Sequence, residues 1–341
     1  MTRPTISSIA KTLSVSKMTI SRVINNQPGV SAELREQINK IIEEVGYTPS
    51  LTARSLAKGK SGIIGVFVPA IVSEWITPLL LGINEEAFAS GFQMLVRSTG
   101  HGKSLPRNAP ELITGNDLID GLIIISWRVP VNFALEMVSK NVPVIIVDGL
   151  IRSPKVSWIS CTDREGMITA VEHLVNLRHE RIAFIGGGTQ AYLARERLNG
   201  FTEGIARMKV SSGDTTIIHS DFTLETGRDC AYKLLNSPNR PTAIIAVNDP
   251  VAIGVIQVAH ELGIEIPREL SVIGIDDTLA QTSVPPLTSI LRDYQGMGRA
   301  AMRLLSDQLS GRVLLGTVTQ MDLGTSLTIR KTTAQALSKP A

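Results

Sequence analysis

The chain has 341 residues, 43% of them hydrophobic and 19% charged, which favours two or three globular domains over a single core. Its two cysteines, Cys161 and Cys230, are far apart and lack CxxC spacing, which argues against a disulfide framework or zinc site and favours a reduced, cytoplasmic setting. No basic segment followed by an apolar run opens the chain, and no apolar run could span a bilayer, so we expect no signal peptide and no membrane partner.

The net charge of +3 is unevenly distributed. Residues 1–60 carry nine Lys or Arg against four Glu, whereas the remaining residues carry 25 basic and 27 acidic side chains. The positive charge therefore lies in the N-terminal part, where it would meet phosphates. Only 4% of the residues are aromatic, which argues against a surface that stacks single-stranded bases.

Residues 5–25 predict two short helices that cross at a steep angle. Apolar side chains recur at helical spacing before and after the short link Leu13 to Val15, and we expect Val15 to be the buried pivot. Thr5 and Ser16 are placed to cap the two helices, because a hydroxyl can accept a backbone N–H that has no partner within the helix. This is the helix-turn-helix geometry, in which the second helix enters the DNA major groove.

The second helix has a basic and polar outer surface, and no acidic residue precedes Glu33. Arg22 can donate two hydrogen bonds to a guanine edge, and Met18 can pack on a thymine methyl. A solvated helical hairpin without function is the alternative interpretation, but the capping, the short turn and the one-sided charge all favour DNA binding. The predicted DNA-contacting residues of this part are Thr5, Ser16, Lys17, Met18, Ser21, Arg22 and Asn25.

A third helix is predicted from its cap at Ser31 to Gly46, and Pro49 then breaks the chain. Residues 50–58 resemble a short helix that would be unstable alone in water, and residues 59–62 a flexible linker. Composition alone supports a plain tether and a functional segment equally.

From Gly62 onward, short β-branched runs alternate with amphipathic segments of helical length, such as 78–90 and 166–177. Strands that are apolar without alternation are buried on both faces, so the pattern predicts parallel sheets flanked by helices in two α/β sandwiches. The predicted strands are IIGVFV, FQMLV, GLIII, VPVIIV, RIAFIG, TTIIHS, TAIIAV and LSVIGI.

Open sheets of this kind bind ligands at the C-terminal ends of their strands. There, Asp249 and Asp277 fit helix caps at least as well as ligand contacts. Asp148, Asn248 and Asp276 are stronger candidates, because carboxylates and amides orient a ligand rich in hydroxyls.

Several segments resemble the lac repressor family (LacI/GalR). The resemblance begins in VSKMTISRVIN and the GYTP turn and continues at VEHLVNLRHERIAFIGG, ARERLNGF, PTAIIAVND, LSVIGIDDT, PPLTSI and IRKTT, so it covers nearly the whole chain except a C-terminal tail. It implies an all-α helix-turn-helix headpiece plus an α/β periplasmic-binding-protein-like body of two doubly wound parallel-sheet subdomains. The implied parts are a headpiece at 1–48, a hinge helix and linker at 49–61, a body at 62–330 and a tail at 331–341. Within the body, the N-subdomain would span about 62–160 plus 293–322 and the C-subdomain about 161–292 plus 323–330.

The resemblance gives the segment after residue 48 a role in DNA binding. In the family this segment is a hinge helix that forms on operator DNA and lies in the minor groove. Leu56, beside Ala53, matches the leucine that wedges a central base step, at a cost of about a few kcal/mol for unstacking the bases.

The resemblance also implies effector contacts. Arg197, Asn248 and Asp276 match family positions that contact the effector, and Trp75 and Phe222 match positions where a ring stacks on the ligand. The full predicted effector-contacting set is Trp75, Ser126, Asp148, Arg195, Arg197, Phe222, Asn248, Asp276 and Arg292.

Four arginines fall near the expected cleft: Arg128, Arg195, Arg197 and Arg292. Arg292 stands where the lac repressor has an uncharged amide. If two or more of the four face inward, their guanidinium groups would favour an anionic ligand such as a sugar acid over a neutral sugar.

Catalytic motifs are lacking in the sequence. GGGTQ after RIAFI matches neither GxGxxG nor the Walker pattern, GxSxG and HExxH are absent, and the five histidines are scattered, with His173 and His179 expected as helix-cap or surface residues. We therefore expect no enzyme, no cofactor and no metal site. Two alternatives stay open, a sugar-binding protein without DNA function and a nucleoside-type enzyme on the same fold.

Together these features predict a cytoplasmic transcriptional repressor of carbohydrate genes. Its homodimer would bind a palindromic double-stranded operator. A sugar or sugar acid in the cleft would change operator affinity by about 1 to 3 kcal/mol, as an inducer or as a corepressor. Because the segment after Arg330 lacks leucine heptads, we expect a dimer rather than a tetramer.

Overall fold

The computed structural model describes residues 4–47, 60–99, 118–125, 129–148, 153–188, 192–210 and 215–337. The chain folds as two compact units, residues 1–61 and 62–341. The predicted hinge residues Ala53 and Leu56, and Ser126 and Arg128 of the predicted cleft, lie outside the described residues. Within the described ranges, no helix is long and apolar enough to cross a membrane.

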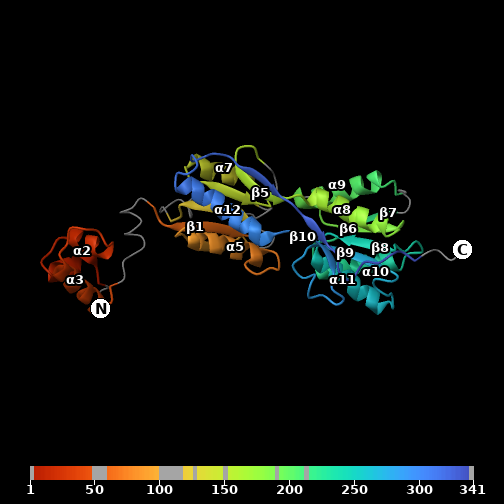
Figure 1. Cartoon of the computed structure of the whole chain (residues 1–341), viewed down its shortest axis with the longest axis horizontal. Helices are drawn as coiled ribbons and strands as arrows, with labels where there is room; N and C mark the ends of the chain where they lie inside the picture. Colours follow the sequence, from red (N-terminus) through yellow and green to blue (C-terminus); the bar gives the residue numbers. More distant parts are fainter. Residues whose placement is uncertain are drawn as a thin grey trace. The chain divides into compact units, whose positions relative to one another are not determined.

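The first unit consists of three short helices (Figure 1): α1 (Ile6–Thr12), α2 (Lys17–Ile24) and α3 (Ala32–Glu44). Thr5, Ser16 and Ser31 cap them through their side chains, as predicted. The helices enclose a small core of Ile9, Ala10, Ile20, Val23 and Ile38. Val15 packs against this core but is half-buried rather than fully buried, because so small a unit cannot cover the turn between α1 and α2.

The second unit contains two six-stranded sheets. The first has the order β11 (Gln320–Leu323), β5 (Ser157–Cys161), β4 (Val144–Val147), β3 (Gly121–Ile125), β1 (Ile63–Val68) and β2 (Gln93–Ser98), and its pairs are parallel. The second has the order β12 (Ser326–Thr328), β10 (Thr288–Leu291), β9 (Ser271–Asp276), β8 (Ala243–Ala246), β6 (Ile182–Gly186) and β7 (Thr215–His219), with only β12 antiparallel to its neighbour.

All eight predicted strands are present, and four further strands, β5, β10, β11 and β12, complete the sheets. The additional strands were not predicted because they are short or polar, as in SWISC and QMDL, and contain no long apolar run. They carry the chain between the sheets. It leaves the first sheet after β5, returns after β10, and crosses to the second sheet again after β11.

Helices cover both faces of each sheet (Figure 1). In the first sheet, α5 (Ile76–Ala89) and α12 (Tyr294–Leu309) pack on one face, and α7 (Val131–Ser139) packs on the other. In the second sheet, α8 (Asp163–Asn176) pairs with α9 (Tyr192–Arg207), and α10 (Leu224–Leu235) pairs with α11 (Asp249–Glu261). α5 and α12 are in such close contact that a Cβ at Gly82 would collide with the carbonyl of Gln295.

Residues after Arg330 pack on the second sheet. Val272 N donates to Thr332 O at 2.8 Å, and Thr332 Oγ1 donates to Val272 O at 2.6 Å. The His179 ring, predicted as a helix-cap or surface residue, is buried beneath this segment and lies 3.0 Å from Ala334 O. That prediction was wrong, because nothing in the local sequence around the end of α8 shows that a distant segment covers it.

Candidate functional site

The outward surface of α2 carries most of the predicted DNA-contacting residues. Ile20 and Val23 turn into the core of the first unit, which leaves the opposite side of the helix in solvent. Lys17, Met18 and Arg22 are exposed, Met18 to 65%. This side is basic and polar and contains no carboxylate, so it suits contact with an anionic duplex.

Several of the predicted contacts also hold the fold together. Thr5 Oγ1 accepts from Ser8 N at 3.1 Å, and Ser16 Oγ accepts from Thr19 N at 3.0 Å. Asn25 Nδ2 donates to the carbonyl of Ser21 at 2.9 Å, and Ser21 itself is half-buried. Both capping hydroxyls also contact a neighbouring hydroxyl, since Thr5 Oγ1 donates to Ser8 Oγ at 3.4 Å and Ser16 Oγ lies 2.9 Å from Thr19 Oγ1.

Two residues that sequence reasoning missed position α2. Arg35 on α3 donates from Nη1 to Val23 O at 3.4 Å, at the C-terminal end of α2, and from Nη2 to Gln27 O at 2.7 Å, in the turn that follows. Gly29 has φ 95°, and a Cβ there would lie 3.3 Å from Nη1 of Arg22. A glycine at this position therefore leaves space beside the arginine expected to contact a base.

A pocket of about 410 Å³ lies in the second unit, lined by residues that follow strands of both sheets. Ser126, a predicted contact, lies outside the described residues. Arg195 does not line the pocket, and its guanidinium lies 5.9 Å from the centre of the Tyr192 ring. The predicted residues that line it are Trp75, Asp148, Arg197, Phe222, Asn248, Asp276 and Arg292.

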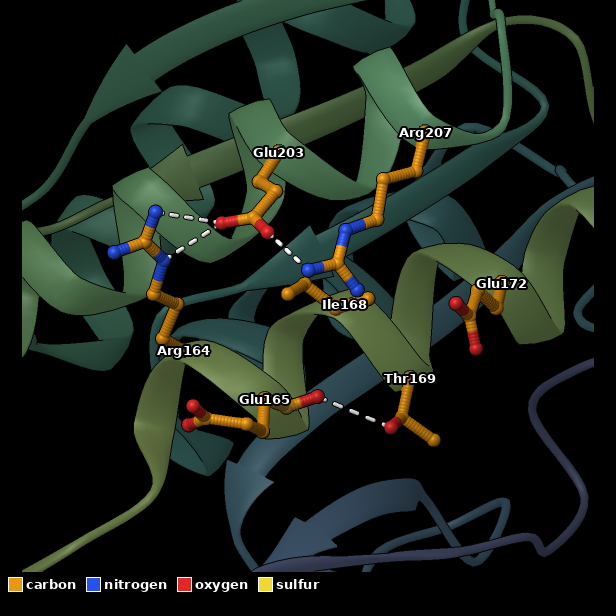
Figure 2. A pocket seen from close by; sticks show the side chains of 7 residues that line it. All are labelled: Arg164, Glu165, Ile168, Thr169, Glu172, Glu203 and Arg207. Carbon is orange, nitrogen blue, oxygen red and sulfur yellow. Dashed lines mark hydrogen bonds and ion pairs between the residues drawn. The ribbon is translucent and has the colours of Figure 1, made fainter.

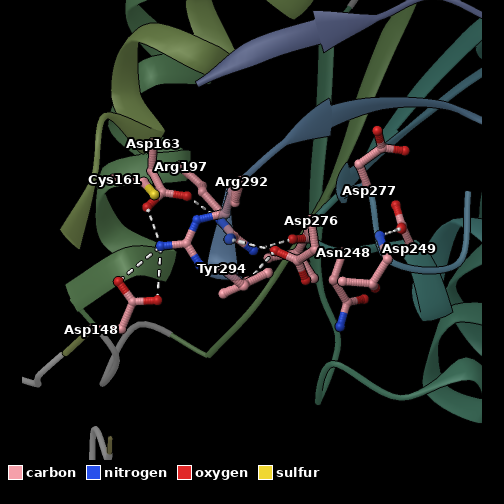
Figure 3. A network of polar contacts seen from close by, with 12 residues as sticks. Asp148, Cys161, Asp163, Arg197, Asn248, Asp249, Asp276, Asp277, Arg292 and Tyr294 are labelled. Carbon is pink, nitrogen blue, oxygen red and sulfur yellow. Dashed lines mark hydrogen bonds and ion pairs between the residues drawn. The ribbon is translucent and has the colours of Figure 1, made fainter. Parts of the chain in front are cut away.

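Arg292 is the centre of a buried polar network at the base of this pocket (Figure 3). It follows β10, is 2% exposed, and lies where the chain returns from the second sheet to the first. Its Nη2 donates to Asp148 Oδ1 at 2.8 Å and to Asp163 Oδ2 at 3.2 Å. Its Nη1 donates to the hydroxyl of Tyr294 at 2.6 Å. Because Asp148 follows β4 and Asp163 opens α8, Arg292 joins the two halves of the body.

Arg197 on α9 holds the other side of the network and is also 2% exposed. Its Nε donates to Asp163 Oδ1 at 2.9 Å, its Nη2 to Asp276 Oδ1 at 3.1 Å, and its Nη1 to the carbonyl of Val247. The hydroxyl of Tyr294 donates to the same Asp276 oxygen at 2.8 Å. Each nitrogen of Arg197 therefore has an acceptor within the protein.

Burial alone would lower the pKa of Arg197, but Asp163 and Asp276 outweigh it and raise the pKa above its ordinary value. Arg292 behaves in the same way, because Asp148 and Asp163 raise its pKa. Burial also raises the pKa of Tyr294, so the phenol stays protonated and continues to donate to Asp276. The arginines therefore carry their charge at any pH at which the protein is folded.

The two arginines that line the pocket do not support the predicted preference for a sugar acid. Both are ion-paired with the carboxylates of Asp148, Asp163 and Asp276. Three carboxylates against two guanidinium groups leave this network with an excess of negative charge. An anionic ligand would have to displace a carboxylate that is already bound.

The polar residues after β8 and β9 divide into caps, core contacts and pocket lining. Asn248, rather than Asp249, caps α11 by accepting from Val251 N at 3.0 Å, while its Nδ2 donates to Phe222 O at 2.9 Å. Asp249 is fully buried and accepts from Ser289 Oγ at 2.6 Å, and burial raises its pKa to about 7. Asp277 pairs with Arg330 at 2.6 Å. Asp249 and Asp277 thus serve the fold.

Sequence reasoning missed several charged residues of the site. Asp163 follows β5, and Asp221 follows β7, so the rule that singled out Asp148 would have found both had it been applied to every strand. SWISC was not recognised as a strand, which hid Asp163. Glu74 also lines the pocket and carried no signal in the sequence.

A second hollow of about 410 Å³ lies on the surface of α8 and α9 (Figure 2). Arg164 Nη2 lies 2.6 Å from Glu203 Oε2, and Arg207 pairs with the other oxygen of Glu203. The hydrogen bond from Arg164 lowers the pKa of Glu203. No predicted site residue lines this hollow, and both of its arginines are already paired with Glu203. Within the described ranges no group of His, Cys, Asp and Glu side chains could hold a metal ion.

Comparison with known proteins decides the family. Residues 5–50 match the family described as bacterial regulatory proteins, lacI family, and residues 171–333 match a periplasmic binding protein-like domain. The HTH-type transcriptional repressor CytR of Escherichia coli (strain K12) is 30% identical over 312 residues, which are 91% of each chain. The chain belongs to the lacI family.

Other relatives of this LacI-family repressor agree. Catabolite control protein A of Priestia megaterium is 28% identical over 319 residues, 93% of this chain and 96% of that protein. A crystal structure of the lac repressor dimer bound to operator and the anti-inducer ONPF matches with a TM-score of 0.86 at 27% identity, covering 98% of this chain and 100% of that chain. The predicted family and fold class are confirmed.

Proposed function

We propose that this LacI-family repressor binds a palindromic operator as a homodimer, and that a small carbohydrate in the body pocket controls its affinity for that operator. The acid-free surface of α2 carries the DNA part of the proposal. Lys17 and Arg22 present positive charge to solvent there, on a helix whose other side is fixed in the core. Base contacts from Arg22 and phosphate contacts from its neighbours would give sequence specificity and affinity, respectively.

The lining of the pocket supports a carbohydrate-sized ligand. Trp75 and Phe222 line the pocket, and the Trp75 ring centre lies 5.8 Å from that of Tyr294. Asp148 and Asp276 also line the pocket, and their carboxylates can accept hydrogen bonds from hydroxyl groups. A volume of about 410 Å³ has room for a mono- or disaccharide.

The position of the pocket supports control of operator affinity. Arg292 and the aspartates around it tie the first sheet to the second at its base. A ligand that binds better to one arrangement of the two halves shifts the protein toward that arrangement. The first sheet begins at Ile63, just after the predicted hinge, so a shift of this sheet would reach the DNA-binding unit through the segment 49–61. We infer a coupling of about 1 to 3 kcal/mol.

Exposed apolar side chains on the first sheet support the homodimer. Leu81 and Phe88 lie two helical turns apart on α5, and Leu95 lies on β2, the edge strand beside it. Phe88 is 84% exposed. Large apolar side chains exposed on a surface helix and on the edge strand of the sheet fit an interface with a second copy.

We infer that the protein acts by binding rather than by catalysis and that it works in the cytoplasm with its DNA partner. The relatives that it matches are named as transcription regulators. Within the described part of the pocket, Asp148 and Asp276 are ion-paired with the two lining arginines, and Asn248 caps α11.

Selection of duplex DNA from a random pool tests the DNA part. We expect enrichment of a palindrome whose two half-sites contact the two copies of α2. Analytical ultracentrifugation of the full chain tests the dimer, and a Phe88→Glu variant should shift it toward monomer. A monomeric wild-type protein at micromolar concentration would contradict the dimer.

A further inference from the structure

In the described ranges, the arginines of the pocket all have ion-pair partners within the protein, whereas some of its carboxylates do not. Arg197 and Arg292, the two arginines of its lining, are ion-paired with Asp148, Asp163 and Asp276. Both are 2% exposed, so neither can offer its guanidinium face to a ligand without breaking these pairs. The positive charges that line the described part of the pocket are therefore already neutralised by carboxylates of the protein.

Two further carboxylates that line the pocket are not matched in this way. Glu74 comes from the loop before α5, and Asp221 from the loop between β7 and α10, so one belongs to each half of the body. Among the residues that the structure describes, neither forms an ion pair. The carboxylate of Glu74 accepts only a long hydrogen bond, 3.3 Å from Ser73 Oγ.

A buried carboxylate oxygen of Asp148, at the base of the pocket, also lacks a hydrogen-bond donor in the part of the chain that the structure describes. Asp148 is 6% exposed, and its Oδ2 receives no hydrogen bond, although it lies 2.8 Å from Nη2 of Arg292. A buried carboxylate oxygen without a donor is costly, and a donor from a ligand would relieve that cost.

Aromatic rings accompany both unmatched acids. Glu74 directly precedes Trp75, Asp221 directly precedes Phe222, and all four residues line the pocket. A ring face attracts a cation through its quadrupole, and a nearby carboxylate adds Coulomb attraction. Each half of the body thus contributes a carboxylate and a ring to the pocket, and this combination favours a positively charged group.

We propose that the ligand of this pocket carries a protonated amine, as in an amino sugar, and that Glu74 and Asp221 select for that charge. This inference rests on the proposed function of the pocket as a carbohydrate site. An ammonium group has three N–H donors, which can bind the unpaired carboxylate oxygens. The hydroxyl groups of the same sugar would contact the buried polar network at the base of the pocket. The sign of the preferred charge is opposite to that of a sugar acid.

Calorimetry on the full chain with matched sugars tests the inference. The probes are glucose, glucosamine and glucuronate, the corresponding galactose set, and a disaccharide with its amino derivative. We expect the amine to bind at least about 10-fold more tightly than its neutral parent, as expected for about one well-placed ion pair in a partly buried site. We expect Glu74→Gln and Asp221→Asn each to reduce that preference several-fold.

Glu225→Gln is the matched control, because Glu225 is an exposed carboxylate on α10 that does not line the pocket. It should leave the affinities of amine and neutral sugar unchanged, and thermal unfolding should show that all three variants are folded. Equal or tighter binding of the neutral parents overturns the amine preference but leaves the carbohydrate site intact. If the sugar acids bind most tightly and Arg128→Gln abolishes that binding, the amine preference is overturned in favour of a sugar acid. If no sugar of any charge binds, the carbohydrate site and the amine preference both fail.

Discussion

The surface of α2 and the pocket in the body use their charged side chains in opposite ways. On α2, Lys17 and Arg22 stand in solvent on a helix held from behind. In the pocket, Arg197 and Arg292 are almost completely buried and bound by carboxylates of the same chain. A surface that binds the phosphates of a partner keeps its hydrogen-bond donors free. The buried arginines of the pocket instead fix the positions of carboxylates that accept hydrogen bonds from a ligand.

This difference predicts that substitutions in the two regions have different effects. Removing an exposed charge from α2 should weaken DNA binding without destabilising the protein, because the side chain makes no contribution to the core. Removing a buried arginine from the pocket should destabilise the body and alter ligand binding together, because the aspartates left behind lose their partner. Measuring stability and binding on the same variants separates the two cases.

The largest effect is expected for Arg22→Ala. A bidentate contact to a base contributes about 1 to 3 kcal/mol, and a dimer makes it in both half-sites, so operator binding should weaken by about 2 to 6 kcal/mol. Fluorescence anisotropy with the selected duplex measures this loss, and the melting temperature should stay at the wild-type value. Lys40→Ala removes an exposed charge from α3 and is the control; an equal loss in that variant would contradict base contact by Arg22.

Arg197→Met should reduce the stability of the body. It leaves the buried Asp276 without a cation and Asp163 with Arg292 alone, and removing one partner of a buried pair costs about 3 to 5 kcal/mol. Chemical denaturation followed by circular dichroism measures the change. Arg207→Ala, an exposed arginine on the same helix, should change stability little. A fully stable Arg197→Met protein would show that the network does not hold the fold.

A smaller effect is expected for Ser16→Ala. The hydroxyl of Ser16 caps α2 through Thr19 N, and losing such a cap costs about 1 kcal/mol. Amide hydrogen exchange in α2 should accelerate, and DNA affinity should fall less than for Arg22→Ala. Ser7→Ala within α1 is the control. Unchanged exchange in α2 would rule out a stabilising cap.

The smallest effect is expected from His179 at acid pH. Burial lowers the pKa of this ring below its ordinary 6.5, so the folded body favours the neutral form. Its contribution to stability is therefore complete above about pH 6.5 and is lost as the pH falls below that value. Denaturation at pH 7.5 and 5.5 measures the difference, which should shrink in His179→Gln. An unchanged pH dependence in that variant would assign the effect to other groups.

The sequence predicted the parts of the molecule that depend on neighbouring residues. The caps at Thr5, Ser16 and Ser31 follow from local chemistry, and the eight apolar strands follow from their unbroken hydrophobic runs. The position of polar residues after parallel strands brought Asp148 and Asp276 to one pocket. These signals need no knowledge of distant contacts.

The remaining features depend on contacts between distant segments. Arg292 lines the pocket as expected, but its partners Asp148 and Asp163 lie 144 and 129 positions earlier in the chain and cannot be paired with it from spacing. The sign of the preferred ligand charge depends on that pairing, which is why the arginines alone suggested a sugar acid. The burial of His179 under residues 331–337 was hidden for the same reason.

Selection from a pool of random duplexes by the full-length protein, repeated with Arg22→Ala, is the most direct measurement of sequence-specific operator binding by α2. A palindrome enriched by the wild type and lost or relaxed at the Arg22-contacted base pairs in the variant is the predicted result. Retention of random DNA by both proteins without enrichment of any sequence would contradict it.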